Sequence, residues 1–539
     1  MAVNLMLSER KGKIMKKISL LLAVCMTLGM TACGGAKKEA QDSGDRPLTY
    51  WTAINSSQIT TMDNYSMLPM FQKLMEKTGV KLEFLHPPAG QAAEQYNLLI
   101  ASGDYPDIIE RNWAGDLGGP GKAIRDGIII PLEETIEKYA PNYNKLLSEN
   151  KELKKAFSTD DGHIFTFGSV TLTPDLMPGG YLIRKDWLAK LGMEAPKCIE
   201  DWEKYFEACK TQLGVEAPFS TDNYRMNTAM LFSESFGIGS KFYVDSDNTV
   251  KYAPIQPEFK EYLTLMNKWF ELGYLDKGIF TNEASIVESK VLNSMTGATY
   301  GFIGSTLGKL IAAAPDSNFK LEAVASPALK AGEEPKLYVP KTVMEDGQKL
   351  GYSLTSTVAF TVKNKDLEKS AKLMDYLYTD EGKLLKNFGI EGTSYNMKDG
   401  KPVYTDEILN NPDGLSVSEA LGKYCRAGYP CPGFGDDPDY LSQYYKYPEQ
   451  IEAMKVYSTN LEHAVAFDMP ALTPAAEEVT EISTLLSTIN TYQEEMFAKF
   501  IMGTEPLENF DKYAETIKSM KIDRILEIYN SAMKRYMSR

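Results

Sequence analysis

Between residues 48 and 111 the chain alternates three strand-like runs with two helix-like runs. The expected order is a strand at 48–54, a helix that Gly79 ends, a strand at 80–84, a helix at 92–101 and a strand that begins at 106. Such βαβαβ units build a parallel sheet with helices on both faces, so the sequence predicts an α/β protein. Ligands of these folds bind at the carboxyl ends of the strands, which here carry Asn55, His86 and Arg111.

The length of 539 residues exceeds what one hydrophobic core can organise, because single cores stop growing near about 250 to 300 residues. We therefore expect two large lobes or more. Apolar residues at 43% and charged residues at 24% are ordinary globular values and argue against a disordered or polytopic membrane chain. The net charge of −15 argues against a nucleic-acid partner. With three His, six Cys and no C-x-x-C spacing, we expect no metal and no cofactor.

The first 32 residues have the pattern of a signal peptide. Four lysines between positions 11 and 17 precede an apolar run at 18–30, which is shorter than the roughly 20 residues that span a bilayer. Met15 is an alternative start, because Lys16 and Lys17 would then form the basic end of a compact signal.

The end of this run, Met30-Thr31-Ala32-Cys33-Gly34, resembles the lipobox of bacterial lipoproteins. The resemblance implies that cleavage leaves Cys33 as a diacylated N-terminus, which would anchor the protein at the outer face of the cytoplasmic membrane. An ordinary secretory signal with an incidental Cys is the alternative. Residues 33–46 are polar and predict a flexible tether, and removal of residues 1–32 leaves a net charge of −19.

Three longer segments carry recognisable motifs: 101–109, with Gly103-Asp104 and Pro106-Asp107; 181–202, with Arg184-Lys185-Asp186-Trp187-Leu188, Gly192, Pro196 and Trp202; and 381–402, with Asn387-Phe388-Gly389-Ile390-Glu391-Gly392. These segments resemble the extracellular solute-binding proteins of sugar ABC importers. The last segment and the tail resemble the large subgroup that contains LipO-type lipoproteins and alginate-oligosaccharide binders. The resemblance covers nearly the whole chain after the predicted signal.

This resemblance implies a two-lobed, type II periplasmic-binding-protein-like α/β fold with an interlobe cleft and a helical C-terminal extension. We expect lobe one at 47–178 and 358–405, and lobe two at 181–355 and 406–539, with crossings near 173–180 and 351–361. The helix predicted at 367–378 has an apolar stripe that is typical of core packing.

The resemblance also implies a function. It predicts a lipid-anchored, monomeric protein that binds an oligosaccharide or another sugar-like solute between hinged lobes and delivers it to an ABC permease without catalysis. Two alternatives stay open: a secreted glycosidase that uses paired carboxylates, and a peptide or amino-sugar receptor of the same fold. The sequence lacks a P-loop, a G-x-S-x-G elbow and an H-E-x-x-H motif.

Sugar sites combine aromatic planes with paired hydrogen-bonding groups, and the predicted strand ends supply both. The candidate residues are Trp51 and Trp113 as stacking platforms, Asn55, Arg111 and Arg184 as hydrogen-bonding groups, Asp222, Tyr224 and Phe302 from lobe two, and Tyr181 and Tyr395. For each of them, plain core or surface placement is the alternative. Arg111, Arg184 and Arg225 leave room for an acidic sugar.

Residues 211–218 lack the alternating oxygen ligands of the calcium loop that alginate binders carry at the corresponding place, so we expect no calcium there. Residues 245–249 predict a hairpin turn instead. Cys198 and Cys209 are expected to be buried thiols. Cys425 and Cys431 bracket a turn and could be either a disulfide or free thiols.

Overall fold

The computed structural model describes residues 46–539 except 56–57, 60, 117, 174–176 and 341–349. The predicted signal peptide, the anchor Cys33 and nearly all of the tether lie outside the described residues. Residues 47–539 form one compact unit, so the boundaries of the two lobes stay a prediction. No described helix is both long and apolar enough to cross a bilayer.

The start of the chain folds into the predicted parallel sheet. β1 (Leu48–Trp51), β2 (Leu82–Leu85) and β3 (Ile108–Arg111) are parallel, with β1 between the other two. α2 (Pro69–Thr78) and α3 (Ala92–Ser102) connect them, and Gly79 ends α2 in the left-handed region at φ 69°. The βαβαβ unit is therefore confirmed.

Three later strands complete a six-stranded sheet in the order β14-β4-β11-β3-β1-β2. They are β4 (Phe167–Thr171), β11 (Gly351–Phe360) and β14 (Gly433–Gly435). β11 runs antiparallel to β3 along the segment predicted as a crossing, and β14 comes from the segment predicted for lobe two. The fully buried Lys386 fixes β14 by donating from Nζ to the carbonyls of Cys431 (2.6 Å) and Gly433 (3.0 Å).

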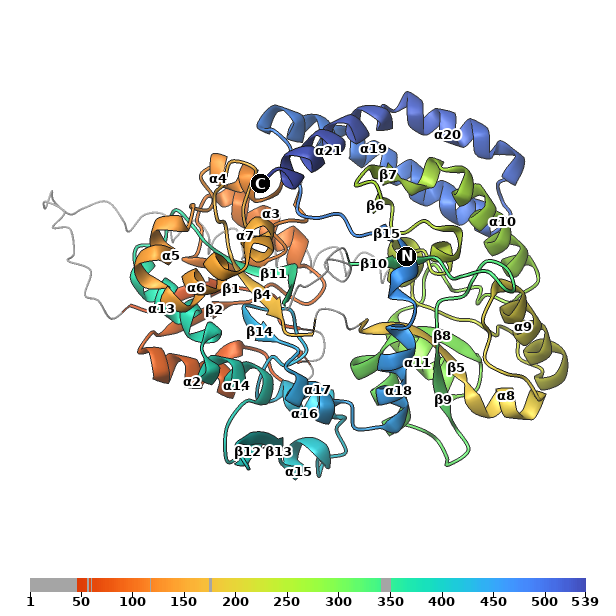
Figure 1. Ribbon diagram of the computed structural model, residues 1–539, viewed down its shortest axis with the longest axis horizontal. Helices are drawn as coiled ribbons and strands as arrows, with labels where there is room; N and C mark the ends of the chain where they lie inside the picture. Colours follow the sequence, from red (N-terminus) through yellow and green to blue (C-terminus); the bar gives the residue numbers. More distant parts are fainter. Residues whose placement is uncertain (1–45, 56–57, 60, 117, 174–176, 341–349) are drawn as a thin grey trace, which may run out of the picture. The chain divides into compact units, whose positions relative to one another are not determined.

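Two further sheets combine strands from residues 179–339 with one later strand (Figure 1). β5 (Gly179–Arg184) is the central strand between β8 (Ala298–Phe302) and β9 (Leu321–Val324). β6 (Phe242–Asp245), β7 (Val250–Tyr252), β10 (Leu337–Val339) and β15 (Ala464–Phe467) form the other sheet. The β6–β7 hairpin confirms the turn predicted at 245–249, and Asn248 has φ 60° there. β12 (Tyr395–Lys398) and β13 (Lys401–Tyr404) form a separate hairpin.

Helices cover these sheets. The remaining α-helices up to the tail are α4 (Gly119–Arg125), α5 (Glu133–Tyr139), α6 (Pro141–Glu149), α7 (Lys151–Ala156), α8 (Lys185–Leu191), α9 (Ile199–Leu213), α10 (Pro257–Glu271), α11 (Ala284–Leu292), α12 (Lys309–Ala312), α13 (Leu367–Asp375), α14 (Asp380–Phe388), α15 (Asp406–Leu409), α16 (Val417–Gly422), α17 (Pro438–Tyr444) and α18 (Pro448–Tyr457). Short 3-10 or π turns are η1 (Tyr65–Met67), η2 (Arg225–Ala229), η3 (Ser233–Phe236), η4 (Ala253–Ile255), η5 (Ile303–Gly308), η7 (Tyr376–Tyr378), η8 (Leu461–His463) and η9 (Leu507–Asn509).

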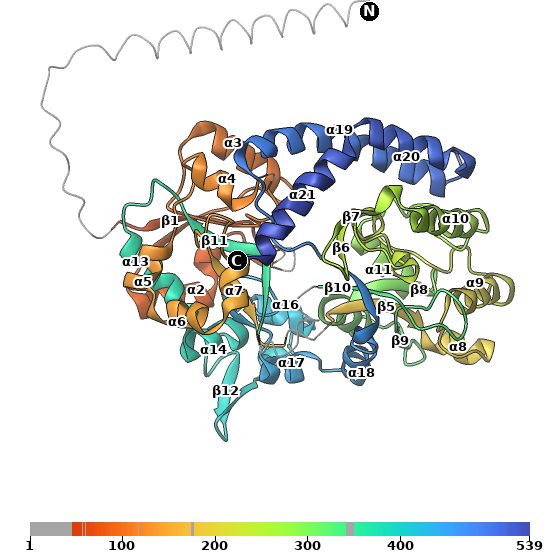
Figure 2. The same cartoon turned by 45° about the horizontal axis from the view of Figure 1, so that its top comes forward.

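The chain ends in three helices, α19 (Ala476–Ile501), α20 (Phe510–Ser519) and α21 (Ile522–Met537). Figures 1 and 2 show α19 beside α10, and α21 lies along α19. Their apolar faces join the buried cluster around Trp202, Phe232 and Trp269. The helical C-terminal extension is therefore confirmed.

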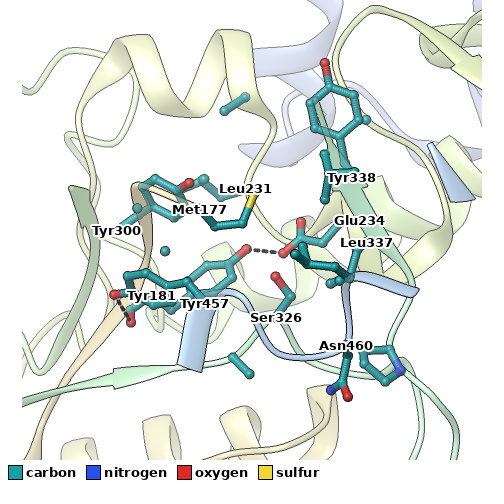
Figure 3. A pocket seen from close by; sticks show the side chains of 18 of the residues that line it. Met177, Tyr181, Leu231, Glu234, Tyr300, Ser326, Leu337, Tyr338, Tyr457 and Asn460 are labelled. Atoms are coloured by element: carbon teal, nitrogen blue, oxygen red, sulfur yellow. Dashed lines mark hydrogen bonds between the residues drawn. The ribbon is translucent and has the colours of Figure 1, made fainter. Parts of the chain in front are cut away.

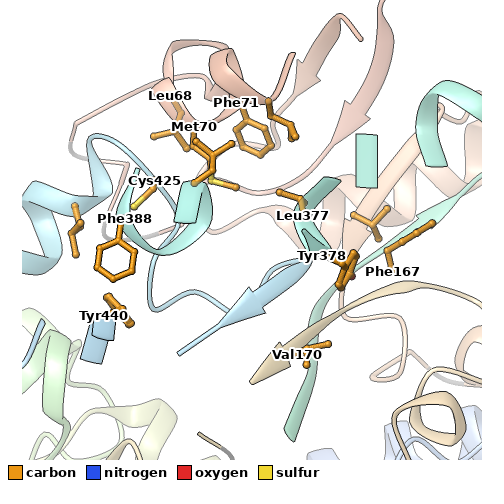
Figure 4. Packing of buried hydrophobic residues seen from close by; sticks show 14 of the residues in the cluster. Leu68, Met70, Phe71, Phe167, Val170, Leu377, Tyr378, Phe388, Cys425 and Tyr440 are labelled. Carbon is orange, nitrogen blue, oxygen red and sulfur yellow. The ribbon is translucent and has the colours of Figure 1, made fainter. Parts of the chain in front are cut away.

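A second large cluster surrounds the six-stranded sheet. Figure 4 shows Phe71, Phe167, Tyr378 and Tyr440 within it. The stripe predicted on the 367–378 helix is core, because Ala371, Met374 and Tyr378 are all at least nine-tenths buried. The same cluster continues through Tyr440 to Leu182 of β5, so the segment around α16–α18 packs against both sheets.

Candidate functional site

A hollow of about 230 Å³ lies at the carboxyl ends of β1 and β3, where the parallel-sheet rule places ligands. We call it the strand-end hollow. Its lining residues are Trp51, Thr52, Ala53, Ala92, Ala93, Glu110, Arg111, Asn112, Thr355, Ser356 and Tyr429. Two predicted site residues, Trp51 and Arg111, line it.

Arg111 is held by its neighbours on one side of this hollow. Its guanidinium carbon lies 3.4 Å from the centroid of the Tyr96 ring and 5.5 Å from that of Trp113, and the group is ion-paired with Asp116. The Trp51 ring is 7% exposed and packs on Tyr96 at 6.1 Å between centroids. Trp113 is fully buried, so it has no ring face open to a ligand in this structure.

Beneath the strand-end hollow lies a buried ion pair between Glu110 and Arg426. Both carboxylate oxygens accept from the guanidinium at 2.8 Å, and they also accept from Tyr50 (2.7 Å) and Ser356 (2.5 Å). Burial alone would raise the pKa of Glu110, but the Arg426 guanidinium and these hydroxyl hydrogen bonds hold it below its usual value. The signal in the sequence was an acid inside the apolar strand at 108–111, which our prediction did not use.

A second cavity of about 330 Å³ lies against β5, and we call it the tyrosine cavity (Figure 3). Its side-chain lining includes Tyr181, Tyr300, Tyr338, Tyr457 and Phe302, the polar residues Ser233, Ser326, Thr459 and Asn460, and the acids Glu234 and Asp468. Tyr181 and Phe302 were predicted site residues. The others were missed, because they come from segments far apart in the sequence.

Hydrogen bonds fix the walls of the tyrosine cavity. The Tyr181 hydroxyl donates to Glu234 Oε1 at 2.7 Å and accepts from the backbone N–H of Phe232 at 2.7 Å. The Tyr457 hydroxyl donates to the Tyr181 carbonyl at 2.8 Å. Phe302 is 46% exposed, which leaves its ring open to contact.

The other predicted site residues line neither hollow. Arg184 is buried. Its guanidinium donates two hydrogen bonds of 2.7 Å to the Asp186 carboxylate, and the ring centroids of Trp187 and Phe319 each lie 4.6 Å from its guanidinium carbon. Tyr395 is buried against Phe388.

The loop residues have three different surroundings. Asp222 is buried and ion-paired with Arg225, whereas Tyr224 is 70% exposed. Asn55 follows β1, and its backbone N–H donates to the Tyr65 hydroxyl at 3.1 Å. None of the three is among the residues found to line the two hollows.

All four described cysteines are buried free thiols, which confirms the prediction for Cys198 and Cys209. The open question for Cys425 and Cys431 is answered in favour of free thiols. Burial raises the pKa of Cys209 and of Cys425 to about 12, so neither is a reactive thiolate. Within the described ranges, no group of three or more His, Cys, Asp or Glu side chains could hold a metal ion together.

Comparison with known proteins identifies relatives of this chain. It is 29% identical over 412 residues to the fructooligosaccharide ABC transporter substrate-binding protein FusA of Streptococcus pneumoniae, covering 71% of this chain and 72% of the relative. It is 23% identical over 376 residues to the lipoprotein LipO of Bacillus subtilis, covering 66% and 69%. The crystal structure of the alginate-binding protein AlgQ2 without calcium ion superposes with a TM-score of 0.74 at 23% identity, over 91% of this chain and 98% of that one.

The structural likeness confirms the predicted fold class, the mixed α/β fold of solute-binding proteins. The family profile described as bacterial extracellular solute-binding protein matches residues 60–384, which is more than half of the chain. This protein therefore belongs to the bacterial extracellular solute-binding proteins.

Proposed function

We propose that this protein is the substrate-binding component of an ABC importer and that its solute is an oligosaccharide. The observation that carries the proposal is a family match together with two hollows that hold the group types a sugar needs. FusA is by name a fructooligosaccharide ABC transporter substrate-binding protein, and the alginate-binding protein AlgQ2 shares the fold.

The chemistry of the two hollows supports binding of a sugar. Sugar rings place their C–H faces on aromatic planes, and Phe302 in the tyrosine cavity and Trp51 in the strand-end hollow offer such planes. Sugar hydroxyls need paired donors and acceptors, which Asn112, Glu234 and Asn460 provide. Of the ten predicted site residues, four line one of the two hollows and remain proposed sugar-binding residues: Trp51, Arg111, Tyr181 and Phe302.

Delivery to a permease needs a conformational signal and no covalent step. We propose that the solute closes two hinged lobes by binding the closed form more tightly than the open one. The protein would then present the closed form to the permease and release the sugar unaltered.

The test is a panel of oligosaccharides measured by thermal unfolding and by chromatography of the incubated sugar. We expect one sugar class to raise the unfolding temperature without any product. Turnover of a panel sugar would instead establish the glycosidase alternative. Stabilisation by peptides alone would establish a peptide receptor.

Variants locate the site for the sugar that binds. Phe302→Ala and Asn112→Ala remove exposed groups from the two hollows, and each should weaken binding about five- to thirtyfold, since a lost stack or hydrogen bond costs about 1–2 kcal/mol. The matched control is Met502→Ala, which removes an exposed side chain at the end of α19 and should leave affinity unchanged. Equal affinity in all three variants would contradict this placement.

We also propose that Cys33 carries a lipid anchor and that the folded body is extracytoplasmic. The family is extracellular, and the segment before Cys33 has the features of a lipoprotein signal. Cys33→Ser should move the protein from the membrane fraction to the medium or periplasm. An unchanged membrane fraction would contradict the anchor. Size-exclusion chromatography of the body that starts at residue 47 should give a monomer.

A further inference from the structure

The tyrosine cavity differs from the strand-end hollow in its charge. Its only ionisable side chains besides tyrosines are the two carboxyl groups Glu234 and Asp468, and no Lys, Arg or His is among the described residues that line it. A carboxylate on a ligand would therefore meet two like charges and no counter-charge in this cavity. Like charges brought together at an interface oppose binding strongly.

Each of the two carboxyl groups is oriented by a tyrosine of the wall. The Tyr181 hydroxyl donates to Glu234 at 2.7 Å, and the Tyr338 hydroxyl donates to Asp468 (Figure 3 shows Tyr181, Glu234 and Tyr338). A carboxylate has about four lone-pair sites, so both groups can accept further hydrogen bonds from a ligand. Sugar hydroxyls are donors of that kind.

The surroundings make an additional negative charge still less favourable. Burial raises the pKa of Glu234 above its usual value, and the enclosing protein raises that of Asp468, which remains accessible, to about 6. Glu234 is thus poorly solvated as an anion, and hydroxyl donors would improve its solvation.

The arginines that could have received an acidic sugar are already paired. Arg184 is bound to Asp186, Arg225 to Asp222, and Arg111 to Asp116. Arg225 comes within 5.5 Å of the Phe302 ring centroid, but its guanidinium is held by Asp222. The net charge of −19 predicted for the body also repels anions at long range.

We infer that the tyrosine cavity selects an uncharged oligosaccharide and rejects uronate-containing ones, with Glu234 and Asp468 as acceptors for sugar hydroxyls. This inference rests on the proposed function. It separates this chain from the structural neighbour AlgQ2, whose name states that it binds alginate, a polyuronate.

The test compares uronate oligosaccharides with their carboxyl-reduced counterparts, in which each carboxylate is replaced by an uncharged hydroxymethyl group. Oligogalacturonates, alginate oligosaccharides and their carboxyl-reduced counterparts, together with fructo-oligosaccharides, are titrated by calorimetry at pH 8. We expect every uronate to bind at least about tenfold more weakly than its carboxyl-reduced counterpart. A uronate that binds as tightly as its reduced form overturns the inference and leaves the proposed function standing. Failure of every saccharide overturns both.

A variant then assigns the selectivity to the two acids. Glu234→Gln combined with Asp468→Asn keeps their size but removes both charges, and it should reduce the discrimination against uronates about tenfold. The control Glu462→Gln changes an exposed acid of η8 that does not line the cavity and should leave discrimination intact. Unchanged discrimination in the double variant overturns the inference.

A measurement on the unaltered protein covers the case in which the double variant does not fold. Salt screens charge repulsion, so uronate affinity should rise between low and high ionic strength while neutral-sugar affinity stays constant. A uronate affinity that falls with salt shows attraction instead and overturns the inference.

Discussion

At the scale of single residues, the pair of Glu110 and Arg426 is the most deeply buried charge contact of the strand-end hollow, with side-chain exposures of 0% and 2%. It joins positions 316 residues apart and holds two lining residues: Ser356 donates to Glu110, and the Arg426 guanidinium carbon lies 5.1 Å from the Tyr429 ring centroid. The pair therefore positions the floor of the strand-end hollow, although only Glu110 of the two is among its lining residues.

Arg426→Met should destabilise the fold by about 3–5 kcal/mol, because it leaves the Glu110 charge buried without a partner. Urea unfolding of the purified body measures this change. The control Lys73→Met breaks the exposed pair with Glu76 and should cost less than about 1 kcal/mol. Equal effects of the two variants would show that the buried pair is not a special determinant of stability.

The pair also predicts acid sensitivity. Since the folded-state pKa of Glu110 is held below its usual value, its contribution to stability is present above the unfolded-state pKa and is lost as pH falls through the folded-state pKa. Glu110→Gln should be less stable than the unaltered protein at pH 7, and the difference should narrow at acid pH. Urea titrations at a series of pH values test this, and a constant difference would contradict it.

At the scale of elements, the end of α21 is tied to the loop after α7 through Asp160. Arg535 Nε lies 2.8 Å from Asp160 Oδ2, and Arg539 donates to the same carboxylate and to the Lys155 carbonyl at 3.1 Å. The C-terminal helices thereby contact a segment that packs with the six-stranded sheet, although most of their core lies in the other cluster.

Asp160→Ala should destabilise the protein by about 1–3 kcal/mol and increase hydrogen exchange in α21, because two charged hydrogen-bond donors lose their acceptor. The control Arg524→Met removes another arginine of α21, whose half-exposed partner Glu481 lies on α19, and should have a smaller effect. Unchanged exchange in α21 after loss of Asp160 would refute this role.

The contact between β5 and α18 depends on a glycine. A Cβ at Gly180 would lie 2.4 Å from the Tyr457 ring, so Gly180→Ala must displace this wall of the tyrosine cavity. We expect a loss of about 1–3 kcal/mol from overpacking, together with weaker sugar binding. The double variant Gly180→Ala, Tyr457→Leu replaces the ring by a smaller side chain, so it should recover stability but not sugar binding. Full stability of the single variant would contradict the tight contact.

At the scale of the whole molecule, bound solute should stabilise the folded body by an amount that rises with the logarithm of its free concentration relative to the Kd. At a free sugar concentration 100 times the Kd, the free energy of unfolding should rise by about 2.7 kcal/mol. Thermal unfolding at several sugar concentrations measures this. A shift that does not follow the independently measured Kd would mean that the sugar also binds the unfolded chain or acts non-specifically.

Short-range patterns in the sequence were enough to predict several elements of the fold. The βαβαβ start, the β6–β7 hairpin and the buried stripe of the 367–378 helix follow from apolar periodicity and turn residues. The helical tail is what the family resemblance implies, and the structure confirms it. Family membership could also be recognised, because its motifs are contiguous segments.

Which side chains share a hollow could be read from the folded structure but not from the sequence. Trp51 and Trp113 were equivalent candidates, yet one lines the strand-end hollow and the other is fully buried, and Arg184 is occupied by Asp186. β14 has too few residues to show a strand pattern, and Glu110 meets Arg426 only through folding. The physical reason is that burial and pairing depend on contacts between distant segments, whereas periodicity reports only on neighbours along the chain.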